Sequence, residues 1–499
     1  MGQPVLLALD QGTTSTRAIL FDPSGVELAS HGVALTQFYP ADGWVEHDPE
    51  EIYRASVAAM RAVLAATGRA VADVAALGIT NQRETVVVWD RKTGRPVHRA
   101  IVWQDRRTAG TCERLRREGH EGRVAMATGL LLDPYFSATK ISWILDNVEG
   151  ARTRGQAGEL MCGTIDTWLI WRLTGGQVHA TDATNASRTL LMDLETQEWS
   201  PDLADLFGVP LAMLPAIRDS AGDFGVMAPE VLGGAVSIRG VAGDQQAALM
   251  GQGCVRPGEM KATYGTGCFL LLNTGTAAPR SGSRLLTTVA ARLNGTATYA
   301  LEGSIFVAGA AIQWLGEGLG IAGGAPAAEA LAQQARENHG VVMVPAFTGL
   351  GAPWWDAEAR GAIFGLTRDA GLAEIAQATF DACALQTHDL VEAMAADAPG
   401  AFGPHVELRI DGGMARSAWF SQRLSDLTGL TVCRAAYQEM TALGAAFFAG
   451  IGAGVYEGPE AVAALRPGAG LLRPRMDAGL RARAHERWRE AVGRVRSLP

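Results

Sequence analysis

The chain has 499 residues, of which 48% are hydrophobic and 19% charged, a composition typical of folded globular proteins and unlike that of disordered chains. A chain of this length exceeds what one hydrophobic core usually supports, so we expect two large lobes with a cleft between them. The formal net charge of -9 argues against a nucleic-acid binder, because no strongly basic stretch offsets it.

The six cysteines are scattered, without a C-x-x-C pair or histidines at ligand spacing, so we expect buried reduced thiols and no zinc site. The first residues lead almost at once into a strand and lack the apolar segment of a signal peptide. The longest apolar run, residues 442–455, is short for a membrane span and contains four glycines. We therefore expect a cytoplasmic protein that does not insert into a membrane.

The first predicted element is a hairpin with a polar turn. Apolar runs at residues 6–9 and 18–21 predict two buried strands, and Gly12 permits the tight reversal between them. Backbone amides, hydroxyls and a guanidinium in the turn can bind phosphate, and a carboxylate beside them can hold Mg²⁺ directly or through water. An ordinary polar hairpin is the alternative for this segment alone. The side chains concerned are Asp10, Thr13, Thr14, Ser15 and Arg17.

A similar unit recurs in the second half of the chain. An apolar run ends at Asp244, and residues 262–272 repeat the order of strand, Gly/Thr turn and strand around Thr266. A third glycine-rich turn, at Gly412 and Gly413, precedes a helical pattern at residues 419–428. These units predict two similar lobes that each direct a phosphate-binding turn into one cleft.

Helices and strands alternate around these turns, as in mixed α/β proteins. The apolar spacing predicts helices at 52–67, 372–395, 441–449 and 478–496, and strands at 77–80 and 85–89. Glycines and Pro257 cluster at residues 251–258 and indicate a boundary between lobes. We therefore expect an N-terminal domain over residues 1–251 and a C-terminal domain over residues 252–499.

Two common nucleotide-binding motifs, Walker A and a G-x-G-x-x-G that opens a βαβ unit, are absent from the sequence. Residues 10–14 instead resemble the first phosphate motif of the superfamily that contains sugar kinases, Hsp70 and actin. Residues 264–267 resemble its second phosphate motif, and residues 411–413 resemble its adenosine motif. The resemblance implies an α/β fold in which two ribonuclease H-like, actin-like ATPase domains flank a cleft for ATP and substrate.

Within this superfamily the chain is similar to the FGGY family of carbohydrate kinases from residue 6 to about residue 456. The similar blocks lie at residues 78–85, 101–108, 133–137 and 243–249. The resemblance is closest to family members that phosphorylate glycerol, and it implies transfer of the γ-phosphoryl group of ATP to glycerol, giving sn-glycerol 3-phosphate and ADP. In those members, matching residues hold the three hydroxyls and line the carbon backbone. The hydroxyl-binding set here is Arg83, Glu84, Tyr135, Asp244 and Gln245, and the aromatic residues are Trp103 and Phe269.

The chemistry of these side chains fits a small uncharged polyol. Such a substrate is recognised through hydrogen bonds, and this set supplies both donors and acceptors. Phosphoryl transfer also needs a base for the alcohol proton, and Asp244 matches the catalytic carboxylate of the family. The structural alternatives are a surface ion pair for Arg83 and Glu84, a core aromatic for Trp103, and a helix N-cap for Asp244.

The resemblance implies further contacts to ATP and Mg²⁺. Asp10 matches the position near the metal, and Ser417 stands where the family usually has a nucleotide-contacting asparagine. The resemblance also suggests a homodimer or homotetramer. A kinase for another polyol or a ketose, and an ATP-gated chaperone-like protein, are the competing hypotheses. The residues expected to contact the nucleotide are Thr13, Thr14, Ser15, Arg17, Thr266, Gly309, Gln313, Gly412, Gly413 and Ser417.

Overall fold

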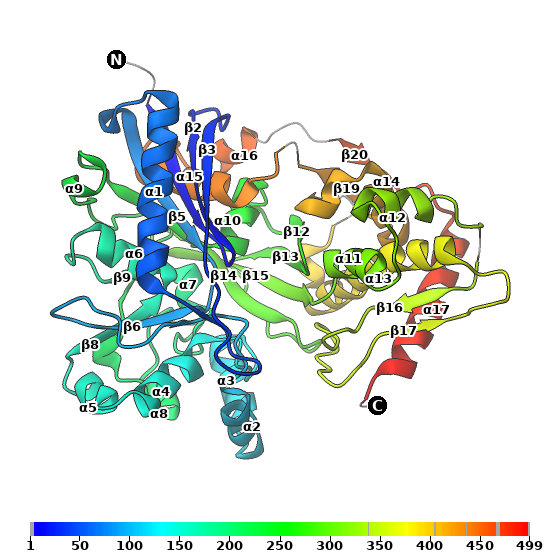
Figure 1. The fold of residues 1–499 in the computed structure, drawn as a ribbon, viewed down its shortest axis with the longest axis horizontal. Helices are drawn as coiled ribbons and strands as arrows, with labels where there is room; N and C mark the ends of the chain where they lie inside the picture. Colours follow the sequence, from blue (N-terminus) through cyan, green and yellow to red (C-terminus); the bar gives the residue numbers. More distant parts are fainter. Residues whose placement is uncertain (1–3, 338, 404–405, 436, 466–469, 498–499) are drawn as a thin grey trace.

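The computed structural model describes residues 4–337, 339–403, 406–435, 437–465 and 470–497, and its two lobes are each built on a large β-sheet (Figure 1). In the first sheet, of order β11-β5-β1-β2-β3, the first three strands in the chain form antiparallel pairs. Strand β5 then adds in parallel beside β1, and β11 adds in parallel beside β5. The strands are β1 (Val5–Gln11), β2 (Ser15–Phe21), β3 (Glu27–Ala34), β5 (Val74–Asn81) and β11 (Ile238–Gly243).

The second sheet repeats this arrangement within the order β14-β15-β13-β12-β18-β19-β20. Its strand β12 pairs antiparallel with β13, β13 pairs antiparallel with β15, and β18 and β19 add in parallel. The expectation of two similar lobes, each with a strand–turn–strand unit, is confirmed. The strands are β12 (Met260–Tyr264), β13 (Cys268–Gly275), β14 (Leu286–Leu293), β15 (Thr296–Ile305), β18 (Glu407–Asp411), β19 (Thr431–Arg434) and β20 (Leu471–Leu472).

The helices expected from apolar spacing are present. Helix α1 (Pro49–Thr67) begins after Asp48, whose side chain accepts the Glu50 N–H at 2.9 Å, and ends at Gly68 in the left-handed conformation. It buries its apolar face on β2 and β3. The other expected helices are α13 (Leu372–Asp397), α14 (Ala418–Thr428), α15 (Met440–Gly452) and α17 (Ala478–Val495).

Helix α15 follows β19 of the second sheet in the chain but packs on the first sheet, against β1, β5 and β11, and on α10 (Asp244–Gly251) (Figure 1). The approach to α10 is close enough that a Cβ on Gly444 would lie 1.8 Å from the Ala247 carbonyl oxygen. The two halves of the chain are therefore interlocked at these helices.

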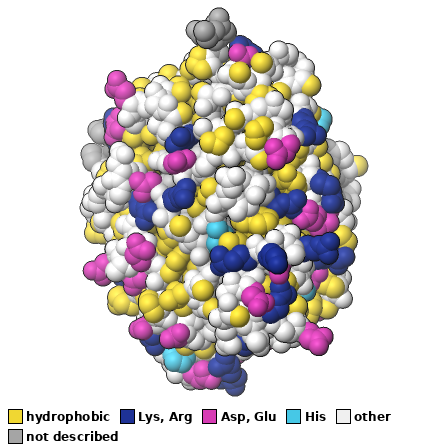
Figure 2. Space-filling view, turned by 90° about the vertical axis from the view of Figure 1, so that its left-hand side faces the viewer, with side chains coloured by type: hydrophobic (Ala, Val, Ile, Leu, Met, Phe, Trp, Pro, Cys, Tyr) yellow, Lys and Arg dark blue, Asp and Glu magenta, His cyan; other side chains and the backbone are white. Residues whose placement is uncertain are grey.

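A smaller sheet of order β4-β7-β6-β8 lies below the first sheet in Figure 1 and supports the loops that carry Trp103 and Tyr135. On the face of this lobe in Figure 2, acidic and basic side chains are interspersed with hydrophobic ones. The strands of the smaller sheet are β4 (Glu46–His47), β6 (Val86–Asp90), β7 (Ala100–Ile101) and β8 (Leu160–Thr164).

The remaining elements connect these parts. They are η1 (Val71–Asp73), α2 (Ala109–Arg117), α3 (Glu121–Thr128), α4 (Ser137–Asn147), α5 (Ala151–Gln156), α6 (Ile165–Leu173), β9 (Ala180–Asp182), α7 (Ala183–Ala186), α8 (Pro201–Phe207), η2 (Leu211–Met213), β10 (Ala216–Arg218), α9 (Pro229–Leu232), α11 (Gly309–Glu317), α12 (Gly324–Ala332), β16 (Val342–Val344), β17 (Ala362–Phe364), η3 (Pro399–Ala401), η4 (Gly413–Arg416) and α16 (Pro459–Ala464).

The cysteines Cys112, Cys162, Cys254, Cys268, Cys383 and Cys433 are all buried thiols, as the sequence predicts. In the part of the chain that the structure describes, none of the helices combines the length and apolar character needed to cross a bilayer.

Candidate active site

The first phosphate turn joins β1 to β2 and is closed by a hydrogen bond from the Gly12 N–H to the Ser15 carbonyl at 3.0 Å. Thr14 is exposed, and Thr13 and Ser15 are half-buried, so their hydroxyls border the surface of the turn. Arg17 forms an ion pair with Glu439, which directly precedes α15. The turn is thus tied to the helix that crosses the first sheet.

Asp10 lies at the end of β1 beside other carboxylates. Burial raises its pKa to about 7, repulsion from Asp244 and Glu439 adds to this, and Arg17 opposes it. The hairpin residue Asp10 and the helix residue Asp244 are therefore close enough to influence each other, although 234 positions separate them in the chain. Acidic groups held together in this way favour a cation between them.

The second phosphate turn joins β12 to β13 and is fixed to the start of α11. The Thr266 carbonyl accepts the N–H groups of Ala308 at 2.9 Å and Ala310 at 3.0 Å, and the Gly309 N–H donates to the Gly265 carbonyl at 3.0 Å. The Thr266 side chain is exposed. Gln313 is also exposed, one turn along α11, where its amide donates to Glu317 at 2.7 Å.

The third glycine turn follows β18 beside the second. Gly412 has a φ of 87°, and a Cβ there would lie 2.4 Å from the Tyr264 carbonyl oxygen, so this position requires glycine. A Cβ on Gly413 would meet open space. Ser417 is the N-cap of α14, where its hydroxyl accepts the Phe420 N–H at 2.8 Å. Serine and asparagine are both good N-caps, which gives a structural reason for either residue at this position.

Arg83 is the centre of the predicted acceptor set and is buried, with 2% exposure. Its Nε lies 3.1 Å from Asp244 Oδ1, and one terminal nitrogen donates to the Tyr135 hydroxyl at 3.3 Å. Glu84 Oε1 lies 4.0 Å from Arg83 Nε. The alternative of a surface ion pair for Arg83 and Glu84 is wrong, since both side chains are buried.

Aromatic rings line one side of these polar groups. The Trp103 ring centroid lies 5.6 Å from that of Tyr135 and 6.5 Å from that of Phe269, both edge to face. Phe269 comes from β13 of the second sheet, so the two lobes share this wall. Trp103 is half-buried, and its indole N–H donates to Thr13 Oγ1 at 2.9 Å. The aromatic wall of Trp103, Tyr135 and Phe269 therefore touches the first phosphate turn.

Asp244 is the first residue of α10, and Gly243 occupies the N-cap, one position before the cap that the sequence suggests. Asp244 Oδ1 still accepts the Gln245 N–H at 2.7 Å. The neighbouring Gln245 is buried, and its side-chain oxygen accepts from Lys261 on β12. This bond leaves the Gln245 amide group as a donor.

Three buried charges at this site were missed by sequence reasoning: Arg188, Lys261 and Glu302. Glu302 contacts Arg83 through both oxygens, at 2.5 Å and 3.2 Å, and Arg188 donates to Glu84 at 2.7 Å. The available signal was a single charge in an otherwise apolar or small-residue segment, as at Glu302 between Leu301 and Gly303. Without strand pairing, that signal does not identify the partner.

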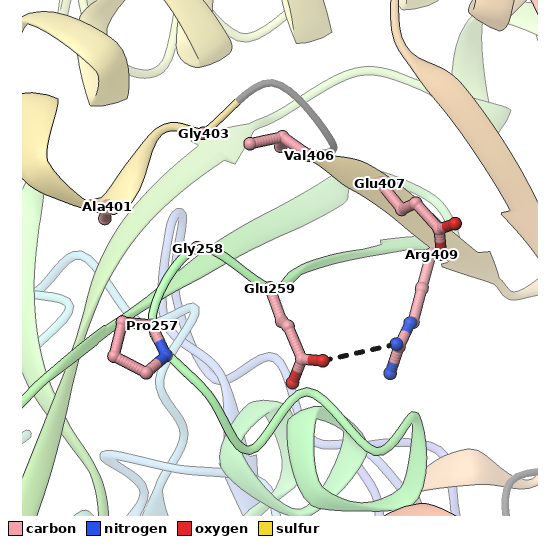
Figure 3. A pocket seen from close by; sticks show the side chains of 8 residues that line it. All are labelled: Pro257, Gly258, Glu259, Ala401, Gly403, Val406, Glu407 and Arg409. Atoms are coloured by element: carbon pink, nitrogen blue, oxygen red, sulfur yellow. Dashed lines mark hydrogen bonds and ion pairs between the residues drawn. The ribbon is translucent and has the colours of Figure 1, made fainter.

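A cavity of about 300 Å³ lies elsewhere in the second lobe, between the starts of β12 and β18 (Figure 3). Two of the lining side chains form an ion pair, in which Arg409 Nη2 lies 3.4 Å from Glu259 Oε1. None of the predicted site residues lines this cavity. Its lining consists of Pro257, Gly258, Glu259, Ala401, Gly403, Val406, Glu407 and Arg409.

Comparisons with known proteins agree with this architecture. Residues 5–251 match the N-terminal domain of the FGGY family of carbohydrate kinases, and residues 260–453 match its C-terminal domain. The chain belongs to this family, so it is a phosphoryl-transferring enzyme with the two-domain fold of the actin-like superfamily, and ATP is the co-substrate that such kinases use.

Individual relatives are similar over the whole chain. A glycerol kinase of Methylobacterium nodulans is 54% identical over 99% of both chains, and one of Alcanivorax borkumensis is 55% identical over 99% of this chain and 98% of its own. The crystal structure of Plasmodium falciparum glycerol kinase with ADP superimposes with a TM-score of 0.93 at 35% identity, covering 99% of this chain and 98% of that one. The predicted family and fold are confirmed.

Proposed function

We propose that this protein transfers the γ-phosphoryl group of ATP to glycerol, giving sn-glycerol 3-phosphate and ADP. The observation that carries the proposal is the buried Arg83, which lies between Asp244, Tyr135 and Glu84 beside an aromatic wall shared by both lobes. The full-length similarity to glycerol kinases supports the same substrate.

The acceptor pocket matches the chemistry of a small polyol. Arg83 and the Gln245 amide supply donors, while Glu84 and Asp244 supply acceptors, so each substrate hydroxyl can be both donor and acceptor. The aromatic wall covers the carbon backbone and excludes water. A pocket of this kind disfavours analogues that lack a hydroxyl, because its own buried polar groups would then stay unpaired.

We propose Asp244 as the general base. Its carboxylate is about one-third exposed, at 32%, and so can reach a substrate. The contacts to Arg83 Nε and to the Gln245 N–H both use Oδ1, and we assign Oδ2 to the alcohol proton. Arg83 and the backbone at the start of α10 hold the carboxylate in one orientation.

The two hydroxyl-rich turns and the third glycine turn are proposed to hold ATP. In this proposal Thr13, Thr14, Ser15 and Arg17 bind phosphate from one lobe, and Thr266 does so from the other. The residues around Gly309, Gln313, Gly412, Gly413 and Ser417 surround the adenosine. Binding between the lobes would exclude water, which limits wasteful hydrolysis of ATP.

Mg²⁺ is proposed at Asp10. The described residues contain no cluster of three His, Cys, Asp or Glu side chains that would form a closed cage for a metal. Mg²⁺ instead usually takes one or two carboxylates together with waters and substrate phosphates. Asp10 fits this pattern, because the carboxylates of Asp244 and Glu439 lie close enough to raise its pKa. When bound, the ion would neutralise charge on the phosphates.

The remaining assignments are also proposals. We propose a cytoplasmic homodimer or homotetramer, which size-exclusion chromatography with light scattering on the purified protein would test. We further propose the division into domains at residues 251 and 252. Limited proteolysis followed by mass spectrometry would test this division.

The function is tested by measuring ADP production with glycerol, erythritol, xylulose or no acceptor. We expect turnover to depend on glycerol and to be much slower with the other acceptors. Faster turnover with erythritol or xylulose would favour a kinase for another polyol or ketose. ADP production that is independent of any acceptor would favour the chaperone-like alternative.

A further inference from the structure

Five buried or half-buried side chains of alternating charge form a continuous chain behind the acceptor pocket. We name this set the charge chain, and it runs Asp244–Arg83–Glu302–Arg188–Glu84. The successive contacts are 3.1 Å, 2.5 Å, 2.9 Å and 2.7 Å. Its two ends and Arg83 belong to the proposed polyol site, whereas Glu302 and Arg188 have no assigned role.

The charge chain joins the two lobes. Arg83 and Glu84 follow β5 of the first sheet, while Glu302 lies on β15 of the second sheet. On β15, Ser304 pairs with Phe269, and Glu302 lies two residues away and therefore on the same face. The Arg83 guanidinium lies 5.8 Å from the centre of the Phe269 ring. The second sheet thus presents both an aromatic ring and a carboxylate to Arg83.

The geometry at Glu302 fixes both arginines. One Glu302 oxygen accepts from Arg83 at 3.2 Å and from Arg188 at 2.9 Å, while the other accepts from Arg83 at 2.5 Å. Such a bidentate contact holds the plane of a guanidinium as well as its position. Glu302 and Arg188 are fully buried, so water does not compete for these bonds.

The charges within the charge chain depend on one another. Burial by itself would raise the pKa of Glu302, but Arg188 and Arg83 outweigh it and lower the pKa to about 2. Glu302 is therefore ionised and separates two positive charges that would otherwise repel each other. Burial also raises the pKa of Glu84, and Arg188 is the group that opposes this rise most strongly.

We infer that Glu302 and Arg188 are positioning residues for the polyol site, an inference that rests on the proposed function. Glu302 holds the Arg83 guanidinium between Asp244 and Tyr135, and Arg188 holds the Glu84 carboxylate in its acceptor orientation. Neither residue touches the reacting atoms. Because Glu302 comes from the second sheet, the acceptor pocket takes its working geometry only when β15 is docked against the first lobe.

The first test is Glu302→Gln, which keeps the size of the side chain and removes its charge. We expect the KM for glycerol to rise roughly 10- to 100-fold, the range given by one lost buried hydrogen bond to a charged group. The KM for ATP should change less than about twofold, because the contacts of Glu302 lead to the acceptor set. A role limited to folding would not separate the two KM values in this way.

Arg188→Lys is the second variant, and it tests the inference if Glu302→Gln folds poorly. Lysine keeps the charge but lacks the fork that reaches Glu84 and Glu302 together. We expect a smaller rise of roughly 3- to 10-fold in the KM for glycerol, because lysine loses one of the two bonds but keeps the positive charge beside both carboxylates. When Glu302→Gln and Arg188→Lys are combined, the rise in the KM for glycerol should be smaller than the product of the two single rises, because both residues act through the same charge chain.

The matched control is Asp381→Asn. Asp381 accepts two hydrogen bonds from Arg423, at 2.9 Å and 2.6 Å, and this pair joins α13 to α14 in the second lobe. We expect this variant to lower the melting temperature and to leave the KM for glycerol unchanged. Folding of all variants would be checked by circular dichroism.

Three results would contradict the inference, and the first can be distinguished from the other two. Absence of glycerol-dependent turnover in the unaltered protein would overturn the proposed function and this inference with it. Normal turnover of the unaltered protein, with an unchanged KM for glycerol in folded Glu302→Gln or Arg188→Lys, would overturn the inference alone. Equal rises in the KM for glycerol and for ATP would also overturn it.

Discussion

Asp244 combines exposure with restraint, as a general base requires. Arg83 and the start of α10 hold one carboxylate oxygen, while the side chain remains open to a substrate. Asp244→Asn keeps an oxygen that can accept these hydrogen bonds, but it cannot take a proton at neutral pH. We expect kcat to fall by roughly 10²- to 10⁴-fold while glycerol still binds, as measured by steady-state kinetics and calorimetry.

A matched control for this variant is Glu259→Gln. Glu259 is also partly exposed, at 26%, and pairs with Arg409 at 3.4 Å in the cavity away from the site. The kcat of the Glu259→Gln variant should remain normal. A near-normal kcat in Asp244→Asn would remove Asp244 from the proposed mechanism.

Trp103 links the aromatic wall to the first phosphate turn through its bond to Thr13. Trp103→Phe keeps a ring against Tyr135 and Phe269 but loses the N–H donor. We expect kcat to fall about 5- to 10-fold, the effect of one hydrogen bond, with a KM for glycerol within about twofold of normal.

Trp199→Phe serves as the control, because its indole also donates one hydrogen bond, at 2.7 Å to the Pro215 carbonyl, outside the proposed site. The kinetic constants should not change in this variant. If Trp103→Phe changed only the KM for glycerol, the bond to Thr13 would have no part in catalysis.

At the residue scale, sequence reasoning reached the groups that face a substrate and missed those behind them. The contacts of Arg83 with Tyr135 and Asp244 join residues that the family motifs identify. Glu302 and Arg188 lie in no such motif, and their importance arises from strand pairing and from burial. The roles of all these residues stay predictions.

Among the secondary structure elements, the packing of α15 on α10 depends on the absence of a side chain at Gly444. A Cβ there would overlap the Ala247 carbonyl, which is backbone and cannot move without shifting α10. We expect Gly444→Ala to lower the free energy of unfolding by about 1–3 kcal/mol, as overpacking in a core does. Urea denaturation would measure this loss.

Gly493→Ala provides the matched control in α17, where an added Cβ meets open space. Alanine is the better helix former, so we expect this variant to be neutral or more stable by up to about 1 kcal/mol. Equal stability of Gly444→Ala and the unaltered protein would show that α15 can move away from α10.

The elements themselves were largely predictable. Apolar periodicity indicated α1, α13, α14 and α17 to within a few residues. The placement of α15 was not predictable in this way, because its spacing shows only that it is buried and not which sheet it covers. Local pattern carries no information about partners that are distant in the chain.

The stability of the whole molecule should depend on pH through buried carboxyls such as Asp389. This residue on α13 accepts the Trp488 indole N–H of α17 at 2.7 Å, and burial raises its pKa from 3.8 to about 7. Between these values the folded protein retains a proton that the unfolded chain releases. The free energy of unfolding therefore falls as pH rises through this window and levels off above it.

Asp389→Asn removes this titration and keeps an oxygen for Trp488. We expect the slope of stability against pH between about 4 and 7 to become shallower by at most about 1.4 kcal/mol per pH unit. Thermal or urea unfolding at pH 5, 6, 7 and 8 would measure it. An unchanged slope in Asp389→Asn would exclude Asp389 as its source.

The six buried thiols give the molecule a set of built-in reporters. Burial raises the pKa of Cys112, Cys162, Cys254 and Cys383 to about 12, so hardly any reactive thiolate is present at neutral pH. Alkylation must then wait for local or global opening, and its rate at each cysteine reports how often that region opens. Mass spectrometry of time-resolved labelling could thus compare the opening of the two lobes with and without substrates, using only the cysteines that the chain already has.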